Sequence, residues 1–176
     1  MDKSEPLSGA RVMPLTTHRD DRGALTELLR VSWQDSPAPV QWNTVTSEAN
    51  VLRGVHVHRV HWDYFFLLSG EMLFGMHDMR PASPTYRRSV LLPLSGEKLT
   101  GISVPPGVAH GFYYSRPSLH VYAVTDYFDP ADEMGCRWDS PELGLNWTNP
   151  RPKLSSRDEK AMSYAELAAL LARGSS

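Results

Sequence analysis

The chain has 176 residues, of which 41% are hydrophobic and 22% charged, an ordinary mixture for one soluble globular domain. Its formal net charge is -2, so no overall positive charge attracts nucleic acid or an anionic membrane surface. The single Cys136 excludes an intramolecular disulfide, and no segment reaches the roughly 18 apolar residues of a membrane span. Because residues 1–8 also lack the apolar run of a signal peptide, we expect a cytoplasmic protein without nucleic-acid or membrane partners.

Short apolar segments dominate the chain after a loose tail at residues 1–12. They are rich in Val, Thr, Tyr, Phe and Trp, which suit half-buried β-strands. The predicted strands are residues 25–32, 40–47, 51–58, 62–68, 72–77, 86–94, 101–104 and 119–128. Turn signals such as Ser69-Gly70 and Pro105-Pro106-Gly107 separate them. Many short strands at spacings of about ten residues indicate a β-sandwich or barrel.

The C-terminal region is predicted to form irregular turns and one short helix. Ser163 and Glu166 have the Ser-x-x-Glu spacing of a capping box, and Leu167, Leu170 and Leu171 then fall on one helical face. We therefore predict an all-β protein with a short C-terminal helix. It forms a single domain, residues 1–176, made of a tail (1–12), a barrel (13–128) and C-terminal turns and helix (129–176).

Several short motifs occur in a fixed order between about residues 20 and 160. They are Asp21-Arg22-Gly23 with Glu27, Gln41-x-Asn43, Leu52-Arg53-Gly54-Val55-His56, Pro106-Gly107-x-Ala109-His110-Gly111-Phe112, Tyr122 with Thr125-x-Tyr127, and Leu154-Ser155-x-x-Asp158. This ordered set resembles the dTDP-4-dehydrorhamnose 3,5-epimerase family. The resemblance implies a cupin-type jelly-roll β-barrel, a homodimer, and an isomerase without a cofactor. Its substrate would be a nucleoside-diphosphate 4-keto-6-deoxyhexose.

The resemblance also implies three catalytic residues. Epimerisation beside a ketone needs a base on one face of the sugar and an acid on the other. His56 would be the base, Asp158 the carboxylate that orients it, and Tyr122 the acid. Strand alternation places His56 and Tyr122 on polar faces, as a ligand cavity requires. The alternatives are structural: a hydrogen-bonded histidine, a core tyrosine and a surface or capping aspartate.

Seven more residues are implied as substrate contacts. They are Arg22, Glu27, Gln41, Asn43, Arg53, His110 and Phe112. The first two resemble a nucleotide-binding pair often supplied across the dimer, and a surface position is the alternative for the first four. Arg53 is one residue out of phase with His56, but the glycine after it permits a local bulge.

Three positions depart from the family pattern, one of them Phe128, which replaces a common tyrosine. His58 stands where the family usually has glutamine, and Asp63 stands where it has a lysine that helps to hold the enolate oxygen. The segment from His56 to Gly70 resembles the first motif of metal-binding cupins, with Asp63 in place of the usual glutamate, and residues 105–110 resemble the second.

These departures leave an alternative open: a metal-dependent cupin enzyme (lyase, isomerase or oxygenase). It would bind one divalent metal ion through His56, His58, Asp63 and His110. A polar cavity that binds nothing is a further alternative. His61 is out of phase with His58 and is expected to be exposed to solvent.

Overall fold

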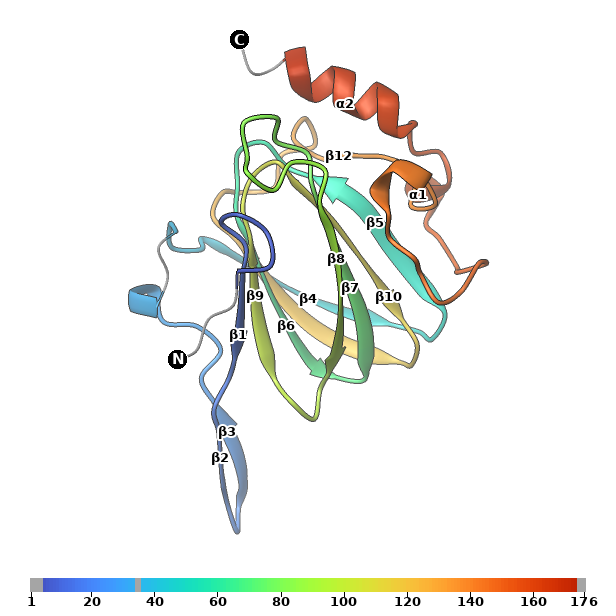
Figure 1. The fold of residues 1–176 in the computed structure, drawn as a ribbon. Coiled ribbons are helices and arrows are strands. Elements are labelled where there is room, and N and C mark those ends of the chain that lie inside the picture. Colours follow the sequence, from blue (N-terminus) through green and yellow to red (C-terminus); the bar gives the residue numbers. More distant parts are fainter. Residues whose placement is uncertain (1–4, 34–35, 174–176) are drawn as a thin grey trace.

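Two five-stranded sheets face each other in a computed structural model that describes residues 5–33 and 36–173 (Figure 1). The first sheet has the order β1 (Arg11–Pro14), β9 (Thr100–Val104), β6 (Asp63–Ser69), β11 (Ser118–Val124) and β4 (Gln41–Ser47). The second has the order β12 (Met134–Gly135), β5 (Val51–Val57), β10 (Val108–Tyr114), β7 (Glu71–Asp78) and β8 (Ser89–Ser95). The predicted all-β jelly roll is confirmed, although within the described residues the two sheets are not hydrogen-bonded into a closed barrel.

An apolar cluster between the sheets holds them together. Phe65 of β6 and Phe74 of β7 are almost fully buried, and their ring centroids lie 5.0 Å apart. Burial of one such side chain stabilises the fold by about 1.5–3 kcal/mol. Phe65 and Phe112 also border a polar cavity, so the core fixes one wall of the candidate site.

The predicted strands from residue 40 to residue 104 correspond to β4–β9. The last predicted strand ends at Val124 rather than at residue 128. The central strand β10 was not predicted; it pairs with both β5 and β7, and its seven residues are all buried.

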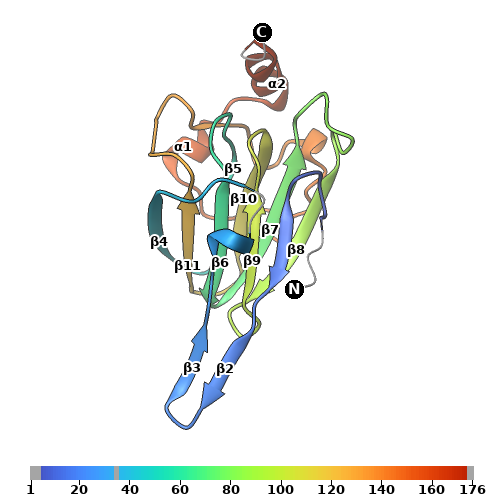
Figure 2. The same cartoon turned by 90° about the vertical axis from the view of Figure 1, so that its left-hand side faces the viewer.

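A separate hairpin of β2 (Thr17–Asp20) and β3 (Gly23–Thr26) projects away from the sandwich (Figure 2). The predicted strand at residues 25–32 is therefore wrong beyond Thr26, where the chain leaves the strand and later forms the 3-10 turn η1 (Val31–Trp33). Leu25 and Val31 are 63% and 60% exposed, whereas Leu28 and Leu29 between them pack against the buried cluster that contains Tyr64 and Phe66.

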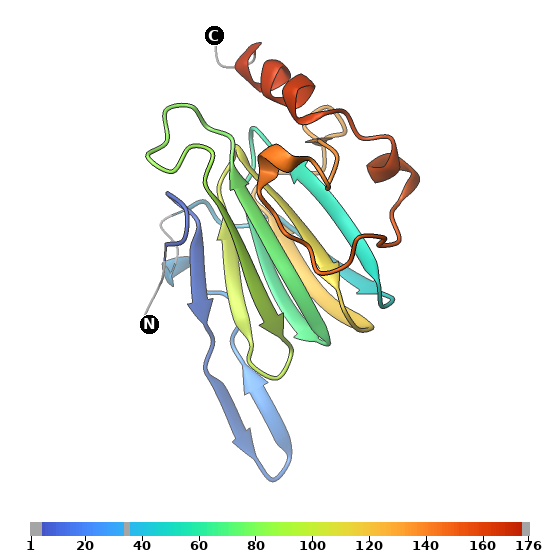
Figure 3. The ribbon, with the colours of Figure 1, turned by 45° about the vertical axis from the view of Figure 1, so that its right-hand side comes forward.

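The C-terminal region runs along the β5 side of the second sheet (Figure 3). It contains η2 (Pro141–Leu143), α1 (Ser156–Glu159) and α2 (Tyr164–Arg173). The predicted capping box is confirmed: Ser163 Oγ accepts a hydrogen bond from Glu166 N at 3.3 Å, and Glu166 Oε2 accepts one from Ser163 N at 2.8 Å. Leu167 is buried, but Leu170 is 38% exposed, so the predicted three-leucine face is only partly correct. Among residues 5–33 and 36–173, no helix has the length and apolar character of a membrane span.

Candidate active site

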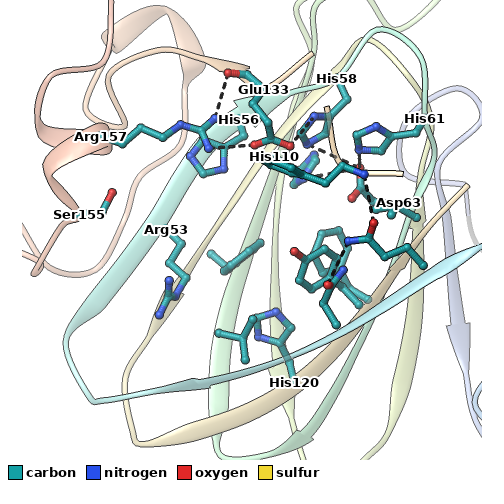
Figure 4. Close-up of a pocket in the computed structure, with 18 of the residues that line it drawn as sticks. Arg53, His56, His58, His61, Asp63, His110, His120, Glu133, Ser155 and Arg157 are labelled. Atoms are coloured by element: carbon teal, nitrogen blue, oxygen red, sulfur yellow. Dashed lines mark hydrogen bonds and ion pairs between the residues drawn. The ribbon is translucent and has the colours of Figure 1, made fainter. Parts of the chain in front are cut away.

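A cavity of about 300 Å³ opens between the two sheets (Figure 4). Strands β4, β6 and β11 of the first sheet, strands β5 and β10 of the second, and the C-terminal region all line it. The sequence-predicted residues at this cavity are Gln41, Asn43, Arg53, His56, His58, Asp63, His110, Phe112, Tyr122 and Asp158. Chain folding therefore brings the three predicted catalytic residues to one space.

A bulge in β5 allows both Arg53 and His56 to face this cavity. In the pairing with β10, His56 lies opposite His110 and Arg53 opposite Phe112, so three steps on β5 match two steps on β10. Gly54 has φ +110°, and a Cβ atom there would lie 2.8 Å from the Cα atom of the facing strand. Glycine at this position therefore permits the bulge that the sequence suggested.

His56 and Asp158 form a carboxylate–imidazole pair. The Nε2 atom of His56 lies 2.7 Å from Oδ1 of Asp158, which is buried on α1. Ser155 starts this helix, since its Oγ accepts a hydrogen bond from Asp158 N at 3.1 Å. Burial alone would raise the pKa of Asp158, but hydrogen bonds from His56, Ser155 and the Gly54 backbone hold that pKa below its ordinary value. Asp158 is therefore ionised at neutral pH and can orient the ring.

Tyr122 reaches the cavity from the opposite sheet. Its ring stacks on Phe65 with centroids 5.8 Å apart and planes inclined by 22°. Within residues 5–33 and 36–173 the hydroxyl group has no hydrogen-bond partner. Burial and the negative charges of Asp63 and Glu133 raise the pKa of Tyr122. The phenol is therefore protonated at neutral pH and can donate into the cavity.

Three further polar atoms at the cavity lack partners among the described residues. They are Nδ2 of Asn43, Nε of Arg53 and Nε2 of His120. Burial and the nearby Arg53 lower the pKa of His120 to about 4, so its ring is neutral. Buried polar groups in native proteins are almost always satisfied, so these atoms point to a polar ligand. His120 was not predicted as a site residue, although it shares the strand face of Tyr122.

The carboxyl group of Asp63 lies among the rings of three histidines. His58, His61 and His110 are all at most 6% exposed, so the expectation that His61 is exposed is wrong. Strand β5 ends at Val57, and alternation counted onward from His58 therefore does not apply. Burial and the neighbouring His61 lower the pKa of His58 to about 4, and burial raises the pKa of Asp63. His56 is hydrogen-bonded to Asp158 and lies apart from this cluster. The predicted metal-ligand set is therefore wrong at His56, and the three other predicted ligands, His58, Asp63 and His110, remain close enough to share one ion.

Glu133 and Arg157 also line the cavity, and neither was predicted as a site residue. Arg157 Nη1 donates to Glu133 Oε2 at 2.8 Å, and Glu133 Oε1 lies 3.5 Å from Nδ1 of His58. Both residues belong to C-terminal segments without strand alternation, so no periodic pattern marked them.

Arg22 and Glu27 do not line the cavity of their own chain. Arg22 lies at the turn of the β2–β3 hairpin, with its side chain 86% exposed and paired with Asp20. Glu27 accepts hydrogen bonds from Arg30. At Gln41, the side-chain amide donates to Asn43 Oδ1 at 3.2 Å, which places both polar side chains at the cavity edge.

The chain is similar in sequence and in structure to known proteins that are named as epimerases. A profile of the family described as dTDP-4-dehydrorhamnose 3,5-epimerase matches residues 4–166. A dTDP-4-dehydrorhamnose 3,5-epimerase of Neisseria gonorrhoeae is 32% identical over 168 residues, which are 91% of this chain. The chain spans about half the length of that relative, 51%.

Two solved structures share the whole fold. The rmlC epimerase of Mycobacterium tuberculosis superposes with a TM-score of 0.90 at 28% identity, over 97% of this chain and 92% of that one. ChmJ, a 3'-monoepimerase from Streptomyces bikiniensis in complex with dTDP-quinovose, has a TM-score of 0.85 at 29% identity, over 96% and 91%.

Proposed function

The chain belongs to the dTDP-4-dehydrorhamnose 3,5-epimerase family, and from this premise we propose that it epimerises a dTDP-linked 4-keto-6-deoxyhexose at C3, C5 or both. The observation that carries the proposal is that His56 and Tyr122, from opposite sheets, line the same cavity. Such an arrangement supplies a base and an acid to the two faces of a sugar ring held between them.

The base is His56. With Nε2 donating to the ionised Asp158 at 2.7 Å, the other ring nitrogen, Nδ1, carries the lone pair that accepts a proton. That proton comes from the carbon next to the ketone, and the electron pair of the broken C–H bond moves onto the carbonyl oxygen. Asp158 stabilises the imidazolium that forms.

The acid is Tyr122. Its protonated hydroxyl donates to the carbon from the opposite face, and the electron pair returns from the enolate oxygen to form the new C–H bond. The configuration of that carbon is thereby inverted. Arg53, Asn43 and His120 contribute the unpartnered polar atoms that contact oxygens of the bound sugar nucleotide.

We propose a homodimer in which the projecting hairpin carries Arg22 and Glu27 to the nucleotide site of the partner chain. Support comes from the apolar surface of the hairpin and of the edge strand β4: Leu25 is 63% exposed and Trp42 50% exposed. Light scattering coupled to size-exclusion chromatography is expected to give twice the mass of one chain. A monomer at micromolar concentration would contradict the dimer and leave the cavity chemistry unaffected.

Exchange with solvent tests the reaction. The protein is incubated in D2O with dTDP-4-keto-6-deoxyglucose, and the C3 and C5 protons are followed by NMR. We expect deuterium at one or both carbons together with an inverted product, and the labelled position identifies the carbon. Neither exchange nor inversion, with this compound or with analogues carrying other nucleotides, would contradict the proposal.

A further inference from the structure

The geometry points to a binding site for one divalent transition-metal ion at the cavity wall, formed by His58, Asp63 and His110 with His61 beside them. The inference that an ion binds here rests on the geometry of these residues and does not depend on the proposed epimerase function. The role that we infer for it, as the group that stabilises the negative oxygen of the enolate, rests on the proposed epimerase function.

Three imidazole nitrogens converge on a single carboxylate oxygen. Oδ2 of Asp63 lies 3.9 Å from Nε2 of His58, 3.7 Å from Nε2 of His61 and 3.9 Å from Nε2 of His110. These separations are too long for hydrogen bonds. Two atoms that each bind one ion at about 2.1 Å can lie up to about 4.2 Å apart, so an ion between them fits the observed spacing.

The second nitrogen of two rings is held by a backbone carbonyl. Nδ1 of His58 donates to the Asp132 oxygen at 3.2 Å, and Nδ1 of His110 donates to the Val108 oxygen at 3.3 Å. A neutral ring that donates from Nδ1 has its lone pair on Nε2, the atom that faces Asp63. This pattern is typical of metal-binding histidines, whose other nitrogen is usually fixed by a carbonyl or carboxylate group.

Asp63 has no other compensation for its charge. Its side chain is 5% exposed, and among residues 5–33 and 36–173 no group donates a hydrogen bond to its carboxylate. A buried carboxylate faced by three lone pairs is strongly unfavourable unless a cation or a proton lies between them. Asp132 is the less suitable ligand, because its carboxylate already accepts hydrogen bonds from the backbone N–H groups of Arg59 and Val60 at 2.8 and 3.1 Å.

The charge of the cavity also favours a dication. The cavity is lined by three carboxyl groups, Asp63, Glu133 and Asp158, but by only two guanidinium groups, Arg53 and Arg157. The formal charges of these five groups sum to -1, which would repel a diphosphate substrate and a developing enolate. One divalent ion changes this balance to +1, and imidazole ligands suit Zn, Fe, Ni, Co or Cu.

The ion and the base are separate. His56 is bonded to Asp158 and does not belong to the cluster, yet both open onto the same cavity. A carbonyl oxygen bound to the ion would receive the electron pair when His56 removes the neighbouring proton. The ion is thus the electrophile, and His56 stays free to act as the base.

Cobalt binding to metal-depleted protein tests the site directly. The full chain is dialysed against EDTA and then against buffer, and CoCl2 is titrated while the visible d–d absorption is recorded. We expect one Co²⁺ per chain, displaced by Zn²⁺. Asp63→Asn and His110→Ala should each weaken binding by at least about 100-fold. The matched control, His120→Gln, changes a buried histidine of the same cavity outside the cluster and should stay within about threefold of wild type.

Absence of stoichiometric cobalt absorption in the wild-type protein, or equal binding by Asp63→Asn, overturns the site. Asp63→Asn removes a buried charge without changing the side-chain shape, so it keeps the test valid should His110→Ala not fold. Solvent exchange measured on the same samples separates the two proposals. Full exchange without metal overturns the electrophile role and leaves the epimerase standing, whereas tight cobalt binding without exchange in either form supports the site and refutes the epimerase.

Discussion

Replacing Tyr122 by phenylalanine removes one oxygen atom from the cavity and leaves the aromatic ring in place. The ring packs on Phe65 with centroids 5.8 Å apart, and that contact does not involve the hydroxyl. The hydroxyl has no hydrogen-bond partner within the described part of the chain. We therefore expect Tyr122→Phe to change the free energy of unfolding by less than about 1 kcal/mol.

The same change should separate two events of the reaction. A positioned general acid typically contributes about 10²- to 10⁴-fold, equivalent to about 3–5.5 kcal/mol of activation free energy. His56 is untouched, so it can still remove a proton and return a deuteron to the same face. Inverted product should therefore form about 10²- to 10⁴-fold more slowly, while deuterium still enters the recovered substrate.

NMR in D2O measures both quantities in one sample, from the label in unreacted substrate and the amount of inverted sugar. Tyr113→Phe is the matched control, because it removes a hydroxyl from β10 that contacts Asn50 and does not line the cavity. Inversion by Tyr122→Phe at the wild-type rate would refute the acid role. Equal loss of exchange and inversion would show that Tyr122 acts before proton removal, which also contradicts our reasoning.

Three further changes give distinct outcomes. Asp158→Asn removes a charge-assisted hydrogen bond to His56 worth about 1.5–3 kcal/mol, so kcat should fall by about 10- to 100-fold and the melting temperature by several degrees; an unaltered kcat would exclude an orienting role. Gly54→Ala should cost about 3 kcal/mol in urea unfolding, since its Cβ would meet the facing backbone at 2.8 Å, and a stable, active variant would show that the bulge is dispensable. Burial alone would raise the pKa of Asp78, but hydrogen bonds from Arg80 and two hydroxyl groups hold it well below its ordinary value. The ionised Asp78 carboxylate therefore stabilises the fold above about pH 4, and this contribution is lost as the pH falls further. Asp78→Asn should lower the free energy of unfolding by about 2–3 kcal/mol at pH 7 and by less at pH 3. An equal loss at both pH values would contradict this linkage.

Runs of β-branched and aromatic residues between Gly and Pro breaks predicted much of the fold, and only some strands also show alternating burial. In β4, for example, burial alternates along the strand from Gln41 to Val45. Strand β10 has no such pattern, since all its residues are buried, and it begins directly after Pro105-Pro106-Gly107. Residues 108–114 also contain Ala109 and Gly111, which are uncommon in strands, so composition did not mark this segment as β-structure.

The predicted site residues at the cavity lie mostly on strands, apart from Asp158 of α1, and His120 of β11 was missed although it also lies on a strand. His56 lies on β5 and Tyr122 on β11, and both line the cavity as their predicted strand faces indicated. His61 lies after the end of β5, where strand geometry no longer determines its direction. Glu133 and Arg157 reach the rim through contacts between distant segments, which no local pattern in the sequence encodes.

Solvent exchange by a His56→Ala variant tests the central claim most directly, because removal of the base should stop both events that Tyr122→Phe separates. With dTDP-4-keto-6-deoxyglucose in D2O, we predict that the folded variant neither incorporates deuterium at C3 or C5 nor forms inverted product, while the wild-type protein does both. Exchange at the wild-type rate without this imidazole would show that another group removes the proton, and the assignment of the cavity would then be wrong.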